Sequence, residues 1–200
     1  MTTLRIHAEL TPLTVELPAQ MSLSLEQFHE LCRANPDLRI ERSATGVVMI
    51  MPPTFSDSGN RNAKISQQLC NWNDETELGE CFDSSTGFTL PNGAIRSPDA
   101  AWIRLERWNA LRDEQQASFA PICPDFVVEL RSASDRLNLL QDKMQEYLDN
   151  GASLGWLIDR PGRTVYVYQR DRPVQVLENP ETLRGDPVLP GFVLRLEKIW

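Results

Sequence analysis

Hydrophobic and polar residues alternate along this chain with two different periods, which predict a mixture of strands and helices. A period of two indicates a strand, whereas apolar residues that recur every three or four positions indicate a helix. The first pattern predicts strands at 4–10, 13–17, 126–130, 154–159 and 164–169, and hairpins at 38–53 and 87–103. Helical segments, one of them a polar helix or loop, are expected at 24–36, from about Asn60, at 104–119 and at 135–150.

Turn and cap residues mark several boundaries between these elements. Ser24, with Gln27 three residues later, forms a capping box at the start of the first helix. Asn92-Gly93 is a strong signal for a tight hairpin turn. Gly151 occupies the position at which helices favour a left-handed cap, so it should end the helix before it.

The order of these elements predicts an α/β or α+β domain around one sheet. Two hundred residues are enough to bury a single core, and no repeat or low-complexity tract suggests a second one. We therefore expect one domain over residues 1–200. Residues 1–20 would form an N-terminal β-hairpin extension that turns at Thr11-Pro12, and residues 21–200 would form the core.

The composition is that of an ordinary soluble globular protein, with 41% hydrophobic and 24% charged residues. No apolar run reaches the length of a membrane span, and Met1 to Gln20 lacks the basic start and apolar centre of a signal peptide. The four cysteines have no paired spacing, so they fit a reducing compartment better than a disulfide framework or a zinc site. We therefore expect a cytoplasmic protein without a membrane segment.

The net charge of −8 is unfavourable for binding nucleic acid, because affinity for phosphate depends largely on Lys and Arg. The distribution of charge weakens this objection. Residues 73–83 hold five acids and no base, whereas residues 159–172 hold four arginines and two acids. An acidic total therefore lowers the expectation of a basic face without excluding it.

Several kinds of catalytic chemistry lack their residues in this chain. The two histidines, His7 and His29, both lie near the N-terminus, and packing is the simpler interpretation for each. Serine and cysteine hydrolysis with a histidine base, and zinc sites that use histidine, are therefore not supported. No glycine-rich phosphate-binding motif is present either. Carboxylates remain, and these bind hard cations such as Mg²⁺ and Mn²⁺.

Two acids stand out because they lie in apolar strands, where an unpaired charge is costly. Asp99 precedes the apolar stretch "AAWI", and Glu129 follows "FVV". Arg131 shares a strand face with Glu129, so a local ion pair between them is the simplest interpretation. Lys143 is an additional candidate, because it flanks the apolar stripe of the next helix and its ammonium can reach the end of the strand.

Three segments, "SPDAAWI", "PDFVVELRSASD" and "LQDKMQEYLDNGASLGWLID", resemble the PD-(D/E)XK nuclease superfamily. More narrowly, the sequence is similar to the bacterial Uma-type family of small proteins that are assigned as restriction endonucleases. The resemblance runs from Met21 to Trp200. It implies a restriction-endonuclease-like core, in which a mixed central sheet is flanked by helices.

The resemblance also implies roles for individual residues. The family's motif aspartate falls on Asp99, and its second acid falls on Glu129. Arg131 stands where a lysine is usual, and the functional lysine would have moved to the next helix, at Lys143. An early acid of the family matches Glu41, which would bind metal through water or orient Lys143; a surface position in its hairpin is an equally good interpretation. The histidine that many members carry has no counterpart in "TFSDSGNRN".

The implied activity is metal-dependent hydrolysis of phosphodiester bonds in DNA. Asp99 and Glu129, with the backbone carbonyl of Leu130, would bind one or two Mg²⁺ ions, for which Mn²⁺ is a possible substitute. Lys143 would orient the attacking water or stabilise charge on the phosphate. Arg131 would contact phosphate or brace Glu129, because a guanidinium does not deprotonate in proteins.

Two alternatives from other classes remain open at this point. One is a nuclease-fold protein without catalytic activity that serves as a binding or regulatory module, which the acidic pI and the missing histidine favour. The other is a structural domain in which Asp99, Glu129, Arg131 and Lys143 form a buried ion network. Similar proteins often form dimers, so we also expect a homodimer, with the hairpin at 155–168 as a candidate interface.

Overall fold

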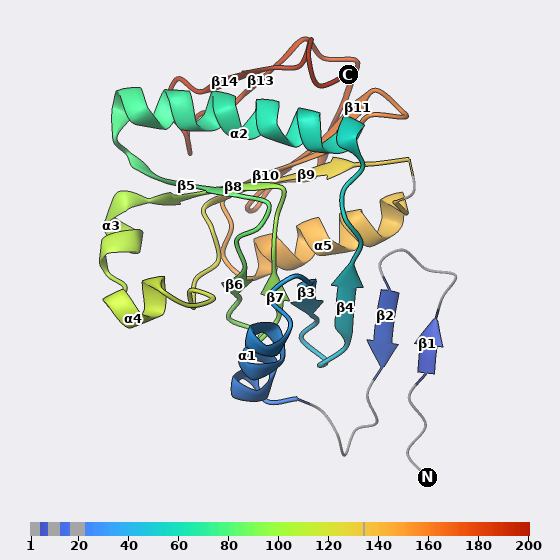
Figure 1. Cartoon of the computed structure of the whole chain (residues 1–200). Coiled ribbons are helices and arrows are strands. Elements are labelled where there is room, and N and C mark those ends of the chain that lie inside the picture. Colours follow the sequence, from blue (N-terminus) through green and yellow to red (C-terminus); the bar gives the residue numbers. More distant parts are fainter. Residues whose placement is uncertain (1–4, 8–12, 17–22, 134) are drawn as a thin grey trace.

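Two six-stranded β-sheets, a small two-stranded sheet and the helices packed on them organise residues 5–7, 13–16, 23–133 and 135–200, which are the residues that the computed structural model describes (Figure 1). The helices are α1 (Leu25–Ala34), α2 (Ser56–Thr76), α3 (Leu105–Asn109), α4 (Asp113–Gln116) and α5 (Leu137–Asp149). The first strands are β1 (Arg5–His7), β2 (Leu13–Glu16), β3 (Arg39–Arg42), β4 (Val48–Met51), β5 (Gly79–Asp83), β6 (Phe88–Thr89) and β7 (Ile95–Arg96). The later strands are β8 (Ala100–Arg104), β9 (Phe126–Arg131), β10 (Leu154–Asp159), β11 (Thr164–Gln169), β12 (Gln175–Glu178), β13 (Thr182–Arg184) and β14 (Val193–Arg195).

The central sheet has the strand order β12-β11-β10-β9-β8-β5 and is mixed. Strands β9 and β10 are parallel, and α5 connects them as the crossover that a parallel pair requires. The other pairs in this sheet are antiparallel. The second sheet, with the order β1-β2-β4-β3-β7-β6, consists of antiparallel pairs. This architecture confirms the expected mixed sheet flanked by helices, but the expectation of a single sheet is wrong, because β1 to β4, β6 and β7 form a sheet of their own.

Helices α2 and α5 cover opposite faces of the central sheet, as Figure 1 shows. The alternation along β9 decides which side chain meets which helix. Phe126 and Val128 pack in the core that includes Ile65 of α2. Val127 packs in the core that includes Met144 of α5. The two-faced pattern predicted for this strand is therefore confirmed, and both of its faces are buried, as is usual for strands in parallel pairs.

The capping and turn signals hold in the described segments. The side chain of Ser24 accepts from the backbone of Gln27, and the Gln27 side chain accepts from the backbone of Ser24. Gly93 and Gly151 have φ values of 84° and 119°, a region that side chains with a Cβ rarely adopt. The expected turn at Thr11-Pro12 and the outer parts of the strands at 4–10 and 13–17 lie outside the described residues.

One expectation about an element is corrected, and one that was left open as a helix or a loop is decided. Helix α2 begins at Ser56, four residues before the expected start near Asn60. Its first turn contains Asp57, which pairs with Arg61 one turn later and accepts a 2.7 Å hydrogen bond from Arg160, so contacts within and beyond the helix stabilise a start that the sequence pattern does not mark. The polar stretch 104–119 contains two short helices, α3 and α4.

The register of the central sheet sets the position of the two predicted acids. Ala100 pairs with Val128 between the antiparallel strands β8 and β9. One step further along this ladder, Asp99 lies level with Glu129, and side chains at directly opposed positions project to the same face.

None of the helices in the described segments is both long and apolar enough to cross a membrane.

Candidate active site

A cavity of about 810 Å³ lies between the second sheet, the adjoining ends of β8 and β9, and α5. Its lining includes five of the six residues that the sequence singles out, and these are Glu41, Asp99, Glu129, Leu130 and Lys143. Glu41 belongs to β3, Asp99 directly precedes β8, Glu129 and Leu130 belong to β9, and Lys143 belongs to α5. Four separate segments of the chain therefore converge here. Arg131, the sixth, is not part of the lining.

Lys143 is the cation at the centre of this group. Its Nζ lies 2.9 Å from Oε1 of Glu129 and 3.0 Å from Oε1 of Glu41. It also donates to the backbone oxygen of Ser97 at 3.4 Å. The side chain is 12% exposed, so its charge is largely removed from water and depends on these acids. The expectation that the ammonium reaches the end of the strand agrees with this geometry.

Glu41 is held by three donors. Besides Lys143, the backbone N–H of Ser97 donates to Oε1 at 3.1 Å, and Nη1 of Arg96 donates to Oε2 at 3.3 Å. Burial by itself would raise the pKa of Glu41, but the charges of Lys143 and Arg96 outweigh it and lower that pKa below its ordinary value. Glu41 is 2% exposed, so the interpretation as a surface residue of the hairpin is wrong.

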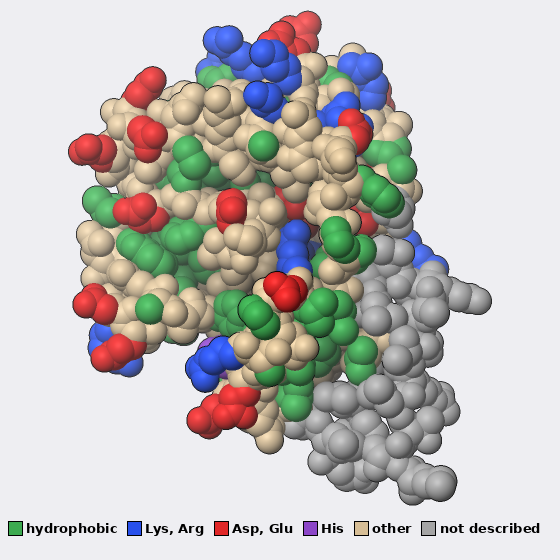
Figure 2. All heavy atoms as spheres, viewed as in Figure 1, with side chains coloured by type: hydrophobic (Ala, Val, Ile, Leu, Met, Phe, Trp, Pro, Cys, Tyr) green, Lys and Arg blue, Asp and Glu red, His purple; other side chains and the backbone are tan. Residues whose placement is uncertain are grey.

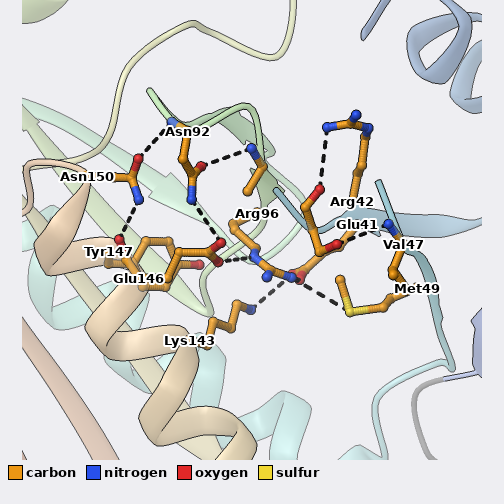
Figure 3. Close-up of polar contacts among 12 residues, drawn as sticks. Glu41, Arg42, Val47, Met49, Asn92, Arg96, Lys143, Glu146, Tyr147 and Asn150 are labelled. Atoms are coloured by element: carbon orange, nitrogen blue, oxygen red, sulfur yellow. Dashed lines mark hydrogen bonds and ion pairs between the residues drawn. The ribbon is translucent and has the colours of Figure 1, made fainter. Parts of the chain in front are cut away.

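Arg96 connects Glu41 to helix α5, as Figure 3 shows. Its Nε donates to Oε2 of Glu146 at 2.6 Å, and its side chain is 11% exposed. Glu146 in turn accepts a 3.1 Å hydrogen bond from Asn92 in the turn between β6 and β7. Glu41, which contacts Lys143, is thus also held by Arg96, a second buried cation.

Glu129 is buried with less compensation than Glu41. It is 4% exposed, and Oε1 also accepts a 3.1 Å hydrogen bond from the hydroxyl of Tyr147. Burial raises the pKa of Glu129 to about 7; the Lys143 ammonium opposes this shift, and the charges of Asp99 and Glu41 add to it. The site therefore holds more negative charge than its own cations neutralise.

Asp99 lies beside the same strand end and is fixed through both of its oxygens. The backbone N–H of Leu130 donates to Oδ2 at 2.8 Å, and Nδ2 of Asn62 donates to Oδ1 at 2.8 Å. Burial raises the pKa of Asp99, although the Leu130 N–H and the nearby Arg39 and Lys143 charges oppose the shift. Asp99 and Glu129 thus share a negative environment that favours binding of a cation or a proton.

Arg131 does not form the local ion pair suggested by the sequence. Its Nη1 lies 2.8 Å from Oδ1 of Asp159, and its Nε donates to the backbone oxygen of Asp135 at 3.0 Å. The parallel register of β9 and β10 aligns Arg131 with Asp159, while Lys143 approaches Glu129 from α5. Contact of Arg131 with a phosphate stays a prediction.

The donors at this site fit a hard divalent cation. Asp99 and Glu129 supply carboxylate oxygens, which suit Mg²⁺ and Mn²⁺. In the part of the chain that the structure describes, no three His, Cys, Asp or Glu side chains form a group that could hold a metal ion, so further ligands would be other oxygens or waters. Asn62, which lines the cavity and contacts Asp99, carries a candidate oxygen, since its Oδ1 is buried and has no hydrogen-bond partner among the described residues. The carbonyl of Leu130 is another candidate, since within a strand it points to the same side as the N–H that contacts Asp99.

Charges of both signs surround the predicted acids. The bases in the lining of the cavity are Arg39, Arg96, Arg136 and Lys143. The acids in the lining are Glu41, Asp99, Glu129, Asp135, Asp142 and Glu146. Figure 2 shows acidic and basic side chains interspersed over this face of the molecule. Without a bound cation the cavity therefore carries an excess of acids, even though bases gather in it.

Three residues of the site were not recognised from the sequence as polar participants. Tyr147 has the helical spacing of the apolar stripe of α5, yet its hydroxyl contacts Glu129. Arg96 lies in a two-residue strand that gives no signal of burial. Asn62 did carry a signal, because it lies three and seven positions before Ile65 and Leu69 and so extends the buried stripe of α2 with a polar residue.

The mixed central sheet, the crossover helix and the paired acids at the strand ends define a restriction-endonuclease-like protein. The chain belongs to the Uma2 family, whose model matches residues 25–197 and is described as "Putative restriction endonuclease". Among solved structures, the chain is similar to "a putative nuclease belonging to DUF820" from Anabaena variabilis ATCC 29413. The TM-score is 0.67 at 18% sequence identity, over 84% of this chain and 90% of that chain, and this likeness shows the fold. No curated protein matched the sequence.

Proposed function

We propose that this protein is a metal-dependent endonuclease that hydrolyses phosphodiester bonds in DNA. Membership of a family described as restriction endonucleases supports the reaction class. The observation that carries the proposal is the position of Lys143, whose Nζ lies 2.9 Å from Glu129 in the cavity that Asp99 also lines. Two acids at the ends of adjacent strands, with a lysine beside them, can bind a cation and stabilise a phosphate at the same point.

Asp99 and Glu129 would hold Mg²⁺, or Mn²⁺ as a substitute, together with the carbonyl of Leu130. When bound, the metal would polarise the scissile phosphate and lower the pKa of a bound water. The contacts of Asp99 with Leu130 and Asn62 fix both of its oxygens, so the acid is oriented before any ligand arrives. Such preorganisation reduces the rearrangement that binding and catalysis require.

Lys143 would act as a charge and a hydrogen-bond donor. Burial alone would lower the pKa of Lys143, but the charges of Glu129 and Glu41 outweigh it and raise that pKa above its ordinary value. The side chain is therefore an ammonium that can orient the attacking water or stabilise charge on the phosphate. Glu41 would orient Lys143, because it contacts Nζ directly and is itself held by Arg96 and Ser97. Arg131 would contact a phosphate of the substrate outside the cavity.

Cleavage of plasmid DNA and of single-stranded DNA and RNA oligonucleotides, with Mg²⁺, Mn²⁺ or EDTA, tests the proposal. We expect metal-dependent cleavage of DNA that is lost in Asp99→Asn and Glu129→Gln. Asp149→Asn is the matched control, because it removes one carboxylate charge from an exposed position of α5. Cleavage that persists in EDTA, or in either site variant, would contradict the proposal.

The same experiment separates the alternatives. Binding of Mn²⁺ and DNA without strand scission would indicate a binding or regulatory module on a nuclease fold. Absence of both cleavage and Mn²⁺ binding would indicate that Lys143 and its acids form a structural ion network. The acid excess in the cavity favours a bound cation over a purely structural network, because it leaves Glu129 incompletely neutralised.

We further propose that residues 1–200 act as one nuclease domain in a cytoplasmic homodimer. The four cysteines, all free, support a reducing compartment. Light scattering coupled to gel filtration tests the assembly, and a monomeric mass would contradict it. Strand β10 is buried between β9 and β11, so only the turn of the hairpin at 155–168 stays a candidate interface. Substitution of Arg163, which is exposed in this turn, then tests it.

A further inference from the structure

Asn62 lies on α2 and contacts one of the acids of the candidate active site. It lies in the lining of the cavity, and its Nδ2 donates to Oδ1 of Asp99 at 2.8 Å. Leu130 donates its N–H to the other oxygen of Asp99. A carboxylate can accept about four hydrogen bonds, two at each oxygen. Each oxygen of Asp99 therefore keeps a lone pair for a cation while a neutral donor fixes its orientation.

The orientation of the Asn62 amide follows from the charge of its neighbour. The oxygen and nitrogen of an amide are assigned from their hydrogen bonds. If the amide were reversed, Oδ1 would face the Asp99 carboxylate, and two acceptors would repel each other. Nδ2 therefore faces Asp99, and Oδ1 faces away from that carboxylate.

Oδ1 of Asn62 is buried and has no hydrogen-bond partner in the segments that the structure describes. Leaving a buried acceptor unsatisfied costs about 1–3 kcal/mol, so such an atom on a residue that lines a polar cavity calls for a ligand. Neutral amide oxygens are good ligands for hard cations and good acceptors for the waters that Mg²⁺ retains when it binds to proteins. The acids that would hold the cation, Asp99 and Glu129, line the same cavity.

We propose that Asn62 is a residue of the metal site. Nδ2 holds Asp99 in its binding orientation, and Oδ1 supplies an oxygen to the hydrated divalent cation. This inference rests on the proposed function, because it requires a cation at Asp99 and Glu129. It also explains why a polar residue extends the buried stripe of α2, where Ile65 and Leu69 pack into the core.

Binding of Mn²⁺ to the metal-free protein, followed by calorimetry and by electron paramagnetic resonance, tests the inference without relying on activity. Asn62→Ala removes both amide atoms, and we expect the Mn²⁺ affinity to fall by about 10- to 100-fold, as is typical when a partner of a metal ligand is lost. The melting temperature of the metal-free variant should stay close to that of the parent, because loss of the hydrogen bond to Asp99 is offset by removal of an unsatisfied acceptor.

Asn62→Asp provides the opposite signature. The new carboxylate faces Asp99, so the metal-free variant should melt at a lower temperature. It keeps an oxygen for the cation and adds a charge, so Mn²⁺ affinity should be retained or increased, and Mn²⁺ should raise the melting temperature more than in the parent. Asn60→Ala is the control, because Asn60 is exposed on the same helix. It should change neither quantity.

The outcomes separate this inference from the proposed function. If Asp99→Ala abolishes Mn²⁺ binding while Asn62→Ala and Asn62→Asp bind as the parent does, Asn62 has only a structural role and the inference alone fails. If the parent does not bind Mn²⁺, or if Asp99→Ala binds it unchanged, both the inference and the proposed metal site fail.

Discussion

Lys143 in α5 and Glu41 in β3 lie 102 positions apart in the sequence, and their Nζ and Oε1 atoms are 3.0 Å apart. The same nitrogen lies 2.9 Å from Glu129, so one buried ammonium serves two buried acids. Arg96 neutralises Glu41 from its other side. Lys143 is thus shared between two acids. Glu41 has a second cation close to it, whereas Glu129 has no second cation at a comparable distance among its described contacts.

The first prediction concerns Lys143→Met. Loss of the ammonium leaves Glu41 and Glu129 less compensated, so the metal-free protein should lose about 3 kcal/mol of its free energy of unfolding. Mn²⁺ should restore part of this loss, because the cation replaces the missing positive charge. Cleavage in Mg²⁺ should fall about 100-fold or more.

Chemical denaturation and cleavage rates on the same preparation measure both effects. Lys64→Met is the control, because Lys64 lies on α2 and contacts Gln67 rather than an acid of the cavity. A Lys143→Met protein that is as stable as the parent and cleaves at the parental rate would contradict both the structural and the catalytic role of this lysine.

The second prediction concerns Arg96→Met. Glu41 loses one of its two cations, so the pKa of Glu41 should rise and the protein should lose about 3 kcal/mol of stability. A double-mutant cycle with Glu41→Gln measures the coupling, for which we expect about 1–3 kcal/mol. Glu146→Gln removes the charge of the other acid that Arg96 contacts and leaves the contact between Arg96 and Glu41 in place. It should therefore reduce cleavage less than Arg96→Met does. Equal losses of cleavage in Arg96→Met and Glu146→Gln would contradict a specific role for the contact with Glu41.

The third prediction concerns Arg131→Ala, which leaves the buried carboxylate of Asp159 without its ion pair. We expect a loss of about 2 kcal/mol of stability with unchanged Mn²⁺ affinity. The double variant with Asp159→Asn should regain part of this stability. If Arg131→Ala is as stable as the parent but weakens binding of a DNA oligonucleotide, the contact with phosphate dominates over the contact with Asp159.

The fourth prediction concerns the dependence of stability on pH in the absence of metal. Burial in the folded state raises the pKa of Glu129 from its ordinary value of 4.5, which applies to the unfolded state, to about 7. Between these values the folded state keeps a proton that the unfolded state releases, so the stabilising contribution is present at low pH and is lost as the pH rises through 7. Melting temperatures of the metal-free protein should therefore decline over this range.

Glu129→Gln should remove this decline, because its amide does not titrate. Mn²⁺ should counteract the decline in the parent, since the cation binds the ionised carboxylate and stabilises the folded state more strongly at higher pH. A metal-free protein whose melting temperature rises steadily between pH 5 and 7.5 would contradict the assigned environment of Glu129.

The sequence was a good guide where short-range patterns decide the structure. The period-two alternation of β9 places Phe126 and Val128 on one face and Val127 on the other, as observed. The stripe of α5 predicts that Lys143 flanks the helix surface that packs on the sheet. Together these local patterns bring Lys143 and Glu129 near each other.

The sequence was a poor guide where long-range register decides the partners. Arg131 lies two residues after Glu129, so a local ion pair was the simplest expectation. The parallel pairing of β9 with β10 instead places Asp159 level with Arg131. That register depends on how α5, which connects the two strands in the chain, packs on the face of the sheet, and no short window of sequence contains this information.

Glu41 and Arg96 illustrate the same limit at the site itself. Both belong to short strands of the second sheet, and their contacts to α5 span 102 and 50 positions of the chain. Nothing local distinguishes Glu41 from a surface residue of a hairpin. Its burial becomes evident only when the second sheet is placed against α5.

The central claim is that Asp99 and Glu129 bind a divalent cation at which DNA is cleaved. The most direct test is an anomalous difference map, recorded near the manganese absorption edge, from crystals of the protein soaked in Mn²⁺. We expect a peak in contact with the carboxylates of Asp99 and Glu129 and close to the carbonyl of Leu130, and we expect it to vanish in Asp99→Asn crystals. A map without a peak at this position, from crystals in which the cavity is open to solvent, would contradict the account.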